Sequence, residues 1–138
     1  MNKVFLDTNV VVDFLCEREG FYLPAAKIIV KGYQKEVELY CSSLTFATAN
    51  YLMERGKISS LEINRKLSDF LTVCQPTPID REIILDALAS SFEDFEDALQ
   101  YFSAKRNGID YIVTRDKKGF DKSEIPTILP IEYLELPI

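Results

Sequence analysis

The chain has no histidine among its 138 residues. Imidazole is the commonest general base in enzymes, a member of Ser-His-Asp and Cys-His triads, and a frequent ligand of catalytic zinc. This single absence therefore excludes hydrolases built on an imidazole base, on a histidine-containing triad or on a His-based zinc site.

Glycine and cysteine are both scarce. Only 5 glycines occur, and they form neither the glycine-rich phosphate loop of nucleotide-driven motors nor the Gly-x-Gly-x-x-Gly fingerprint of dinucleotide enzymes. The three cysteines are odd in number, far apart and surrounded by apolar residues: Cys16, Cys41 and Cys74. This pattern indicates reduced thiols in a core rather than a disulfide framework or a thiolate zinc site.

Long apolar runs are missing as well. No segment of the sequence reaches the roughly 18 apolar residues that a transmembrane helix needs. Asp7 interrupts the first apolar segment, where a signal peptide would be continuous. We therefore expect a cytoplasmic protein with no membrane partner. The composition is that of an ordinary globular protein, so residues 1–138 are predicted to form one domain.

Basic residues are in the minority. The 22 acidic residues outnumber the 16 basic ones, which gives a net charge of -6. A protein that bound nucleic acid mainly by counterion release would be basic instead. Any phosphate-bearing partner must therefore be met by local positive charge. A divalent cation held by the excess carboxylates would reverse the sign of the field at its site.

The sequence does contain an alternation of short apolar segments and amphipathic segments. Apolar segments typical of buried strands occupy residues 3–6, 37–41, 73–78, 110–114 and 126–131. Helical patterns begin after Asn9 and at Pro24, continue through 45–55, and recur at 59–71, 80–91 and 93–106. Strands joined through helices pair in parallel by right-handed crossovers. We predict an α/β fold, a three-layer α/β/α sandwich around a central, mainly parallel sheet.

Acidic residues stand where the predicted strands end. Asp7 closes the first strand, and Asp116 follows the strand at 110–114 by two residues. Ligands of an open parallel sheet bind beyond the carboxyl ends of its strands, so both side chains should project from one edge. Asp94 and Asp97 lie three residues apart near a helix start, which places them on one helix face. Clustered carboxylates are the oxygen-rich environment that Mg²⁺ or Mn²⁺ prefers.

Each of these acids also has a purely structural interpretation. Asp7 can cap the helix that follows it, and Asn9 can serve equally well as that cap. Asp94 and Asp97 fall in a first helical turn, where the macrodipole favours acids without any function. Asp116 can be a solvated turn residue. At this point both interpretations stay open.

Taken together, the segments resemble the PIN-domain family. Val-Phe-Leu-Asp-Thr-Asn-Val near the start and Ile-Val-Thr-Arg-Asp-Lys-Lys-Gly-Phe near the end carry the resemblance. The segment that runs from Asp94 to Ala104 resembles the helix with the third acidic position, and Ser43-Leu-Thr45 resembles the lead-in to the second. The resemblance covers nearly the whole chain. It implies a PIN-like sandwich and a metal-dependent ribonuclease, often the toxin of a toxin-antitoxin pair.

The resemblance also implies roles for single residues. Asp7, Asp97 and Asp116 match the family's metal positions and would be the catalytic residues, with Asp94 as an auxiliary ligand. The cofactor would be Mg²⁺ or Mn²⁺. The expected partners are an RNA substrate, an antitoxin protein and a second copy of the chain in a homodimer.

Two positions depart from the family's pattern. The family usually places an acid three residues after Thr45, where this chain has Thr48. Relatives frequently carry another acid where Gly119 stands. The loss of a ligand should weaken cation binding, and it favours one metal ion over two.

Neighbouring polar and basic residues have two interpretations each. The supporting polar residues are expected to be Thr8, Asn9, Thr48 and Thr114. They can orient the carboxylates or a phosphate, or simply satisfy backbone groups at strand ends. The basic residues beside the last acid are Arg115, Lys117 and Lys118. They can guide an RNA backbone or form a solvated face.

Two other functions compete with a ribonuclease. Thr48 and Gly119 favour a catalytically degenerate PIN domain that acts as an RNA-binding or protein-binding module. A phosphatase with Asp7 as its covalent nucleophile would gain support from an acid two residues later, but Asn9 stands there.

Overall fold

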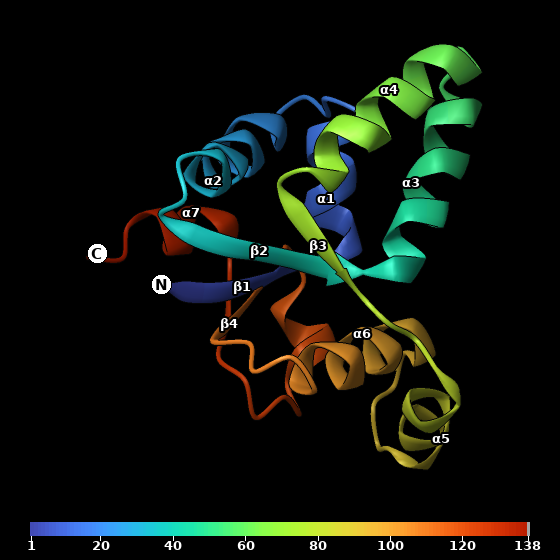
Figure 1. Ribbon diagram of the computed structural model, residues 1–138. Coiled ribbons are helices and arrows are strands. Elements are labelled where there is room, and N and C mark those ends of the chain that lie inside the picture. Colours follow the sequence, from blue (N-terminus) through green and yellow to red (C-terminus); the bar gives the residue numbers. More distant parts are fainter. Residues whose placement is uncertain (138) are drawn as a thin grey trace.

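A computed structural model describes residues 1–137, and its centre is a five-stranded sheet (Figure 1). The strands are β1 (Asn2–Leu6), β2 (Val37–Ser42), β3 (Cys74–Thr77), β4 (Tyr111–Val113) and β5 (Thr127–Ile128). Their order across the sheet is β3-β2-β1-β4-β5, and each neighbouring pair is parallel. The first strand therefore lies at the centre, beside β4.

Helices cover both faces of this sheet, which confirms the predicted α/β/α sandwich (Figure 1). The helices are α1 (Thr8–Leu15), α2 (Tyr22–Tyr33), α3 (Ser43–Arg55), α4 (Ser60–Leu71), α5 (Arg81–Ala89), α6 (Phe95–Lys105) and α7 (Pro130–Leu134), with a short 3-10 helix η1 (Lys117–Phe120). Helix α1 packs on α2 and α3, and α3 packs on α4. Helices α5 and α6 pack together on the opposite face.

Side chains of β1 alternate between two apolar cores. Val4 and Leu6 belong to the larger core, under α1 to α4. Phe5 points the other way and packs against Tyr101 of α6. Successive residues of a strand face opposite sides, so a strand buried on both faces must be apolar throughout. This explains the uninterrupted apolar segment that precedes Asp7.

Side-chain caps decide where several helices begin. The side chains of Ser59, Asp80 and Asp94 each accept a hydrogen bond from the backbone N–H three residues later, at 3.2, 3.0 and 2.9 Å. Gly108 follows α6 with a φ of 63°, the left-handed conformation that glycine adopts readily just after a helix. The sequence thus predicted where these helices begin and end to within a few residues.

The predicted strand at 126–131 is wrong in its second half. Strand β5 ends at Ile128, and α7 begins at Pro130. Proline is well suited to the first turn of a helix, where its missing N–H is not needed. A carboxylate oxygen of Glu132 accepts a hydrogen bond from the N–H of Leu129 at 2.9 Å, which closes this helix start. Tyr133 of α7 is buried and α7 packs on α2, so helix packing decided this segment.

The three cysteines lie in or near the core, as the sequence indicated. Cys41 and Cys74 are buried and Cys16 is partly buried, all as free thiols. Between residues 1 and 137, no helix combines the length and the apolar character that crossing a membrane requires.

Candidate active site

Asp7 stands at the carboxyl end of the central strand, and its carboxylate is held by two fixed donors. The N–H of Thr8 donates to Oδ1 at 2.7 Å, and the hydroxyl of Thr114 donates to Oδ2 at 2.7 Å. Asp7 is therefore the cap of α1, as one interpretation of the sequence had it, whereas Asn9 lies inside that helix. Asp7 is also only 5% exposed, far more buried than a cap requires.

Thr114 connects Asp7 to the second strand-end acid. Its hydroxyl oxygen accepts a hydrogen bond from the N–H of Asp116 at 3.0 Å while its proton goes to Asp7. The N–H of Asp7 in turn donates to the carbonyl of Val113 at 2.9 Å. The ends of β1 and β4 are thus bonded together, and Asp116 projects from the same sheet edge as Asp7.

The third carboxylate comes from the start of α6. Asp94 caps this helix, and Asp97 lies one turn further along. The carboxylate of Asp97 lies directly against the backbone of Gly119 in η1. A Cβ at Gly119 would overlap Oδ2 of Asp97 and would lie 3.3 Å from Oδ2 of Asp116. The absence of a side chain at Gly119 therefore lets these two carboxylates lie close together.

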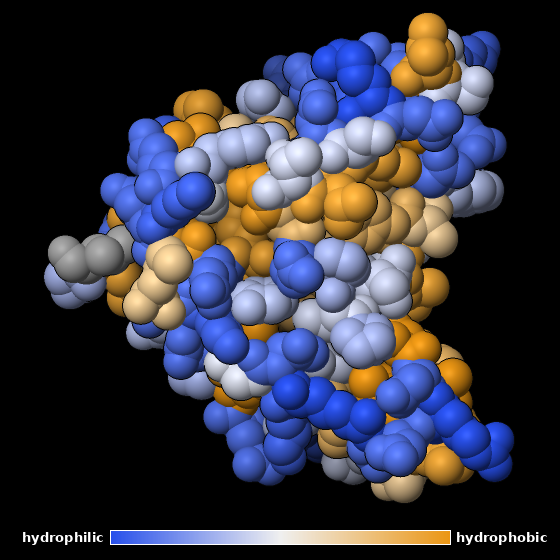
Figure 2. All heavy atoms as spheres, in the orientation of Figure 1, coloured by the Kyte–Doolittle hydropathy of each residue, from blue (hydrophilic) through white to orange (hydrophobic). Residues whose placement is uncertain are grey.

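A cleft of about 340 Å³ collects these residues. Its lining residues are Asp7, Thr8, Asn9, Val12, Arg18, Leu52, Asp94, Glu96, Asp97, Gln100 and Asp116. All four predicted acids line it, as do Thr8 and Asn9. Helix α3 contributes Leu52, and Thr48 is not among the lining residues described. Figure 2 shows the surface hollowed between the lobe of α3 and α4 and the lobe of α5 and α6.

Comparison with known sequences decides the family. The sequence model of the PIN domain matches residues 3–118. The chain belongs to the PIN domain family. A sequence relative, ribonuclease VapC1 of Aquifex aeolicus (strain VF5), is 27% identical in an alignment that covers 96% of this chain and 94% of that protein.

Solved structures show the same fold. VapBC2 from Rickettsia felis, bound to a DNA fragment from their promoter, matches with a TM-score of 0.67 and 17% identity over 92% of this chain and 98% of that one. VapC20 from Mycobacterium tuberculosis, a sarcin-ricin loop cleaving toxin, matches with a TM-score of 0.61 and 15% identity over 79% and 86%. At such low identities the similarity shows the fold alone.

The floor of the cleft in this PIN domain is a polar network that the sequence did not reveal. Gln100 is 1% exposed, and its carbonyl oxygen accepts from the N–H and the hydroxyl of Thr8 at 3.1 and 3.2 Å. The Thr8 hydroxyl also lies 2.8 Å from the hydroxyl of Thr45. Gln100 follows Asp97 by three residues, so helical spacing could have indicated it. Arg18 comes from the turn after α1, and no spacing rule points to it.

The carboxylates perturb one another. Burial is the main cause that raises the pKa of Asp97 to about 7, and the negative charges of Asp7, Asp94 and Asp116 raise it further. Burial also raises the pKa of Asp7, although the hydrogen bonds from Thr114 and from the N–H of Thr8 partly offset this. The pKa of Glu96 is raised by burial and by the charges of Asp94 and Asp7. The site therefore crowds negative charge, and within residues 1–137 the one basic side chain that lines it is that of Arg18.

The basic residues predicted to bind RNA are engaged elsewhere or lie outside the cleft. Arg115 forms a two-bond fork with the buried Asp13, at 2.6 and 3.1 Å, and its guanidinium lies 3.9 Å from the ring centre of Phe21. Lys117 donates to Glu132 at 3.3 Å. Lys118 is exposed. None of the three basic residues appears among the described residues that line the cleft.

Proposed function

We propose that this PIN domain is a divalent-metal-dependent endoribonuclease that hydrolyses RNA phosphodiester bonds, and that it is the toxin of a toxin-antitoxin pair. The observation that carries the proposal is the convergence of Asp7, Asp97 and Asp116 from three separate elements on one cleft. The relatives support the same reading, because one is named a ribonuclease and another a sarcin-ricin loop cleaving toxin.

The chemistry of the donor set fits Mg²⁺ or Mn²⁺. The charged groups of the cleft that can bind a metal ion are carboxylates, and hard cations take hard oxygen ligands. The raised pKa of Asp97 also supports a cation site. The neighbouring acids disfavour the ionised form of Asp97, and a bound cation would favour it. Within residues 1–137 no three acids already stand at the spacing of a ligand set, so binding requires side-chain rotation.

Asp7, Asp97 and Asp116 would hold the cation, with Asp94 as an auxiliary ligand. A bound divalent cation lowers the pKa of a water molecule and neutralises charge on phosphoryl oxygens. The protein's part is positioning. Thr8 and Thr114 lock the Asp7 carboxylate, which leaves the exposed Asp116 and the half-buried Asp97 as the members that adjust.

We infer one metal ion rather than two. The position at which the family usually supplies a further acid holds Thr48, and α3 contributes the apolar Leu52 to the cleft instead. The carboxylates therefore come from one side of the cleft and from its floor. A two-metal site would need more ligands than this set offers.

The partners follow from the same proposal. We infer a small antitoxin protein and a homodimer. The antitoxin is supported by the similar fold solved as VapBC2 on promoter DNA. The homodimer rests on the family resemblance, and sedimentation of the purified chain tests it: a species of the monomer mass of 15.8 kDa at all concentrations would contradict it.

Titration of the protein with Mn²⁺ by calorimetry, with cleavage of a labelled single-stranded RNA followed in the same samples, tests the function. We expect Asp7→Asn to abolish both metal binding and cleavage, because asparagine can still cap α1 but carries no charge. The exposed Asp121→Asn, outside the cleft, is the matched control and should retain both. A wild-type protein that binds no Mn²⁺ at millimolar concentration and leaves RNA intact contradicts the proposal.

A wild-type protein without Mn²⁺ binding or RNA cleavage would favour the alternative, a degenerate PIN domain that serves as an RNA-binding or protein-binding module. This alternative is favoured by the side chains of α3. Thr48 stands in place of an acid, and the described α3 residue that lines the cleft is the apolar Leu52. Folding would then be unaffected by the Asp7 substitution while the wild type showed no metal-dependent cleavage.

A further inference from the structure

We propose that the guanidinium of Arg18 forms a second subsite of this cleft, which binds a backbone phosphate neighbouring the one held at the carboxylates. The inference rests on the proposed function, because the phosphate belongs to the RNA substrate. Among the described residues that line the cleft, Arg18 is the one basic side chain. It therefore gives the cleft an acidic end and a cationic end.

The two ends are separated by the length of α1. The lining follows this helix from Asp7 through Asn9 and Val12 to Arg18. Eight helical residues rise by about 12 Å, and the long arginine side chain reaches back over part of that distance. A short stretch of single-stranded backbone therefore spans from the carboxylates to the guanidinium.

The backbone of Arg18 is fixed on both sides. Its N–H donates to the carbonyl of Asp13 at 3.0 Å, and its carbonyl accepts from the N–H of Tyr22 at 2.8 Å. Glu17, just before it, has a φ of 51°, which turns the chain from α1 towards α2. The backbone of the subsite is thus tied to two helices.

The positive charge of Arg18 is not fully neutralised by the ion pairs around it. Asp13 is 1% exposed, and Arg115 already satisfies its two carboxylate oxygens with a fork of hydrogen bonds. Arg18 lies 3.7 Å from the same carboxylate, too far for a hydrogen bond, and its side chain is 41% exposed. Two guanidiniums share one carboxylate, so one positive charge remains. A guanidinium with its donors unused is well suited to a phosphate.

Glu17, the acid next to Arg18 in the sequence, does not neutralise the Arg18 guanidinium. Glu17 pairs with Lys66 of α4 at 3.2 Å, and the same lysine also donates to the carbonyl of Leu15 at 2.9 Å. The ion pairs described for residues 1–137 join Arg18 to Asp13 and to none of the cleft carboxylates. Arg18 therefore faces the cleft as a cation rather than as the partner of its acids.

Steady-state cleavage of a single-stranded RNA at several salt concentrations tests the subsite. We expect Arg18→Gln to raise KM about tenfold with kcat nearly unchanged, since about that affinity is lost with one charged hydrogen-bonding contact. The slope of log KM against log salt should fall by about 0.7, the value for one phosphate of a single strand. Arg18→Lys keeps the charge, so it should keep the slope even if KM rises.

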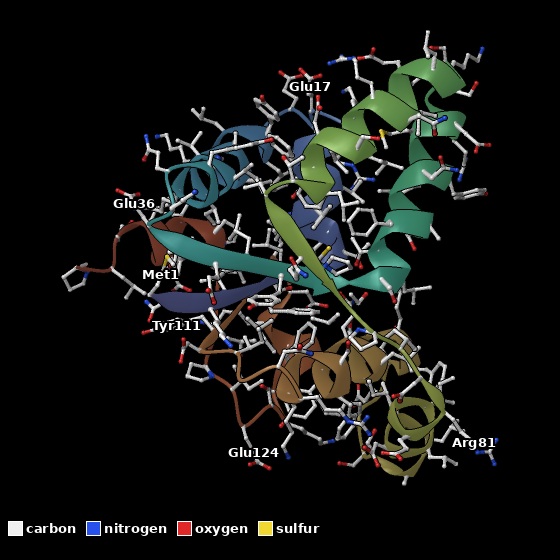
Figure 3. The ribbon with its side chains drawn as sticks, viewed as in Figure 1. Met1, Glu17, Glu36, Arg81, Tyr111 and Glu124 are labelled. Carbon is white, nitrogen blue, oxygen red and sulfur yellow. The ribbon has the colours of Figure 1, made fainter. Side chains whose placement is uncertain are left out.

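The control is Arg81→Gln, which removes the same charge at the exposed start of α5. Figure 3 shows Arg81 at the outer end of its lobe, far from Glu17, which precedes Arg18. This variant should match the wild type in KM and in salt slope. A shift as large as that of Arg18→Gln would mean that any lost charge has the same effect, and would overturn the subsite.

The remaining outcomes separate the two proposals. If Arg18→Gln cleaves RNA with the KM and salt slope of the wild type, the subsite is overturned and the nuclease stands. A loss of kcat at constant KM would also overturn it, because Arg18 would then act at the reacting group. If the wild type neither binds nor cleaves RNA, both proposals fall together.

Discussion

Gly119 determines how closely Asp97 and Asp116 approach each other. A Cβ at this position would overlap the Asp97 carboxylate and crowd that of Asp116. We predict that Gly119→Ala displaces the Asp97 carboxylate and lowers Mn²⁺ affinity severalfold, with little change in the free energy of unfolding, because the atom in the way is the far end of a flexible, half-buried side chain. Calorimetric Mn²⁺ titration and urea denaturation measure the two effects.

Gly56→Ala is the matched control for this substitution. The nearest atoms to a Cβ at Gly56 are backbone oxygens at 3.5 and 3.6 Å, an ordinary contact. This variant should bind Mn²⁺ like the wild type. If Gly119→Ala did the same, the close approach of the two carboxylates would have no part in metal binding.

At the scale of elements, the ion pair between Asp13 and Arg115 joins α1 to the loop that follows β4. The carboxylate is buried, and the pair spans 102 residues of sequence. We predict that Asp13→Asn lowers the free energy of unfolding by about 1–2 kcal/mol, because it removes the charged partner of Arg115, whose side chain is 30% exposed and can still be hydrated. Urea denaturation measures this. Since Asp116 follows Arg115, Mn²⁺ affinity should fall as well.

An exposed ion pair provides the control for this prediction. Glu62 pairs with Arg65 on the outer face of α4, where both side chains are solvated. Pairs of this kind contribute little to stability. Glu62→Gln should therefore unfold at the same urea concentration as the wild type. An Asp13→Asn variant as stable as Glu62→Gln would show that the buried pair does not hold the loop.

At the scale of the whole molecule, crowded carboxylates should make stability depend on pH. The pKa of Asp97 is raised to about 7 by burial and by neighbouring acids, against 3.8 for an ordinary aspartate. A raised folded-state pKa stabilises the protein fully below about pH 4, and this contribution is lost as pH rises to about 7. Asp97 is only half-buried, so solvent screening limits the effect to about 1–2 kcal/mol.

Thermal unfolding between pH 4 and 8 without divalent cations tests this linkage. We predict that the difference in Tm between Asp97→Asn and the wild type grows in favour of the variant as pH rises from about 4 to about 7 and levels off above that. Added Mg²⁺ should stabilise the wild type at pH 8 and leave the variant nearly unchanged. A difference in Tm that did not vary with pH would mean that burial and the neighbouring acids do not raise the pKa of Asp97.

Much of the architecture was determined by the sequence alone. The alternation of apolar segments and amphipathic helices implied parallel strands with helices on both faces, and the structure has that arrangement. The sheet edge where Asp7 and Asp116 meet followed from it, because parallel strands end on the same side. Two short elements were not predicted. The apolar segment around Pro130 is as compatible with a strand as with the short helix α7, and the 3-10 helix η1 has no helical pattern of its own.

The finer arrangement of the cleft was decided only by the tertiary structure. The pairing that withdraws Arg115 from the cleft joins residues 102 apart, and the bond between Thr8 and Gln100 joins residues 92 apart. The exposure of Arg18 in the cleft depends on that first pairing as well. Local spacing can place a side chain on a helix face or at a strand end. Which distant side chain meets it there depends on how the layers pack, and no local pattern encodes that.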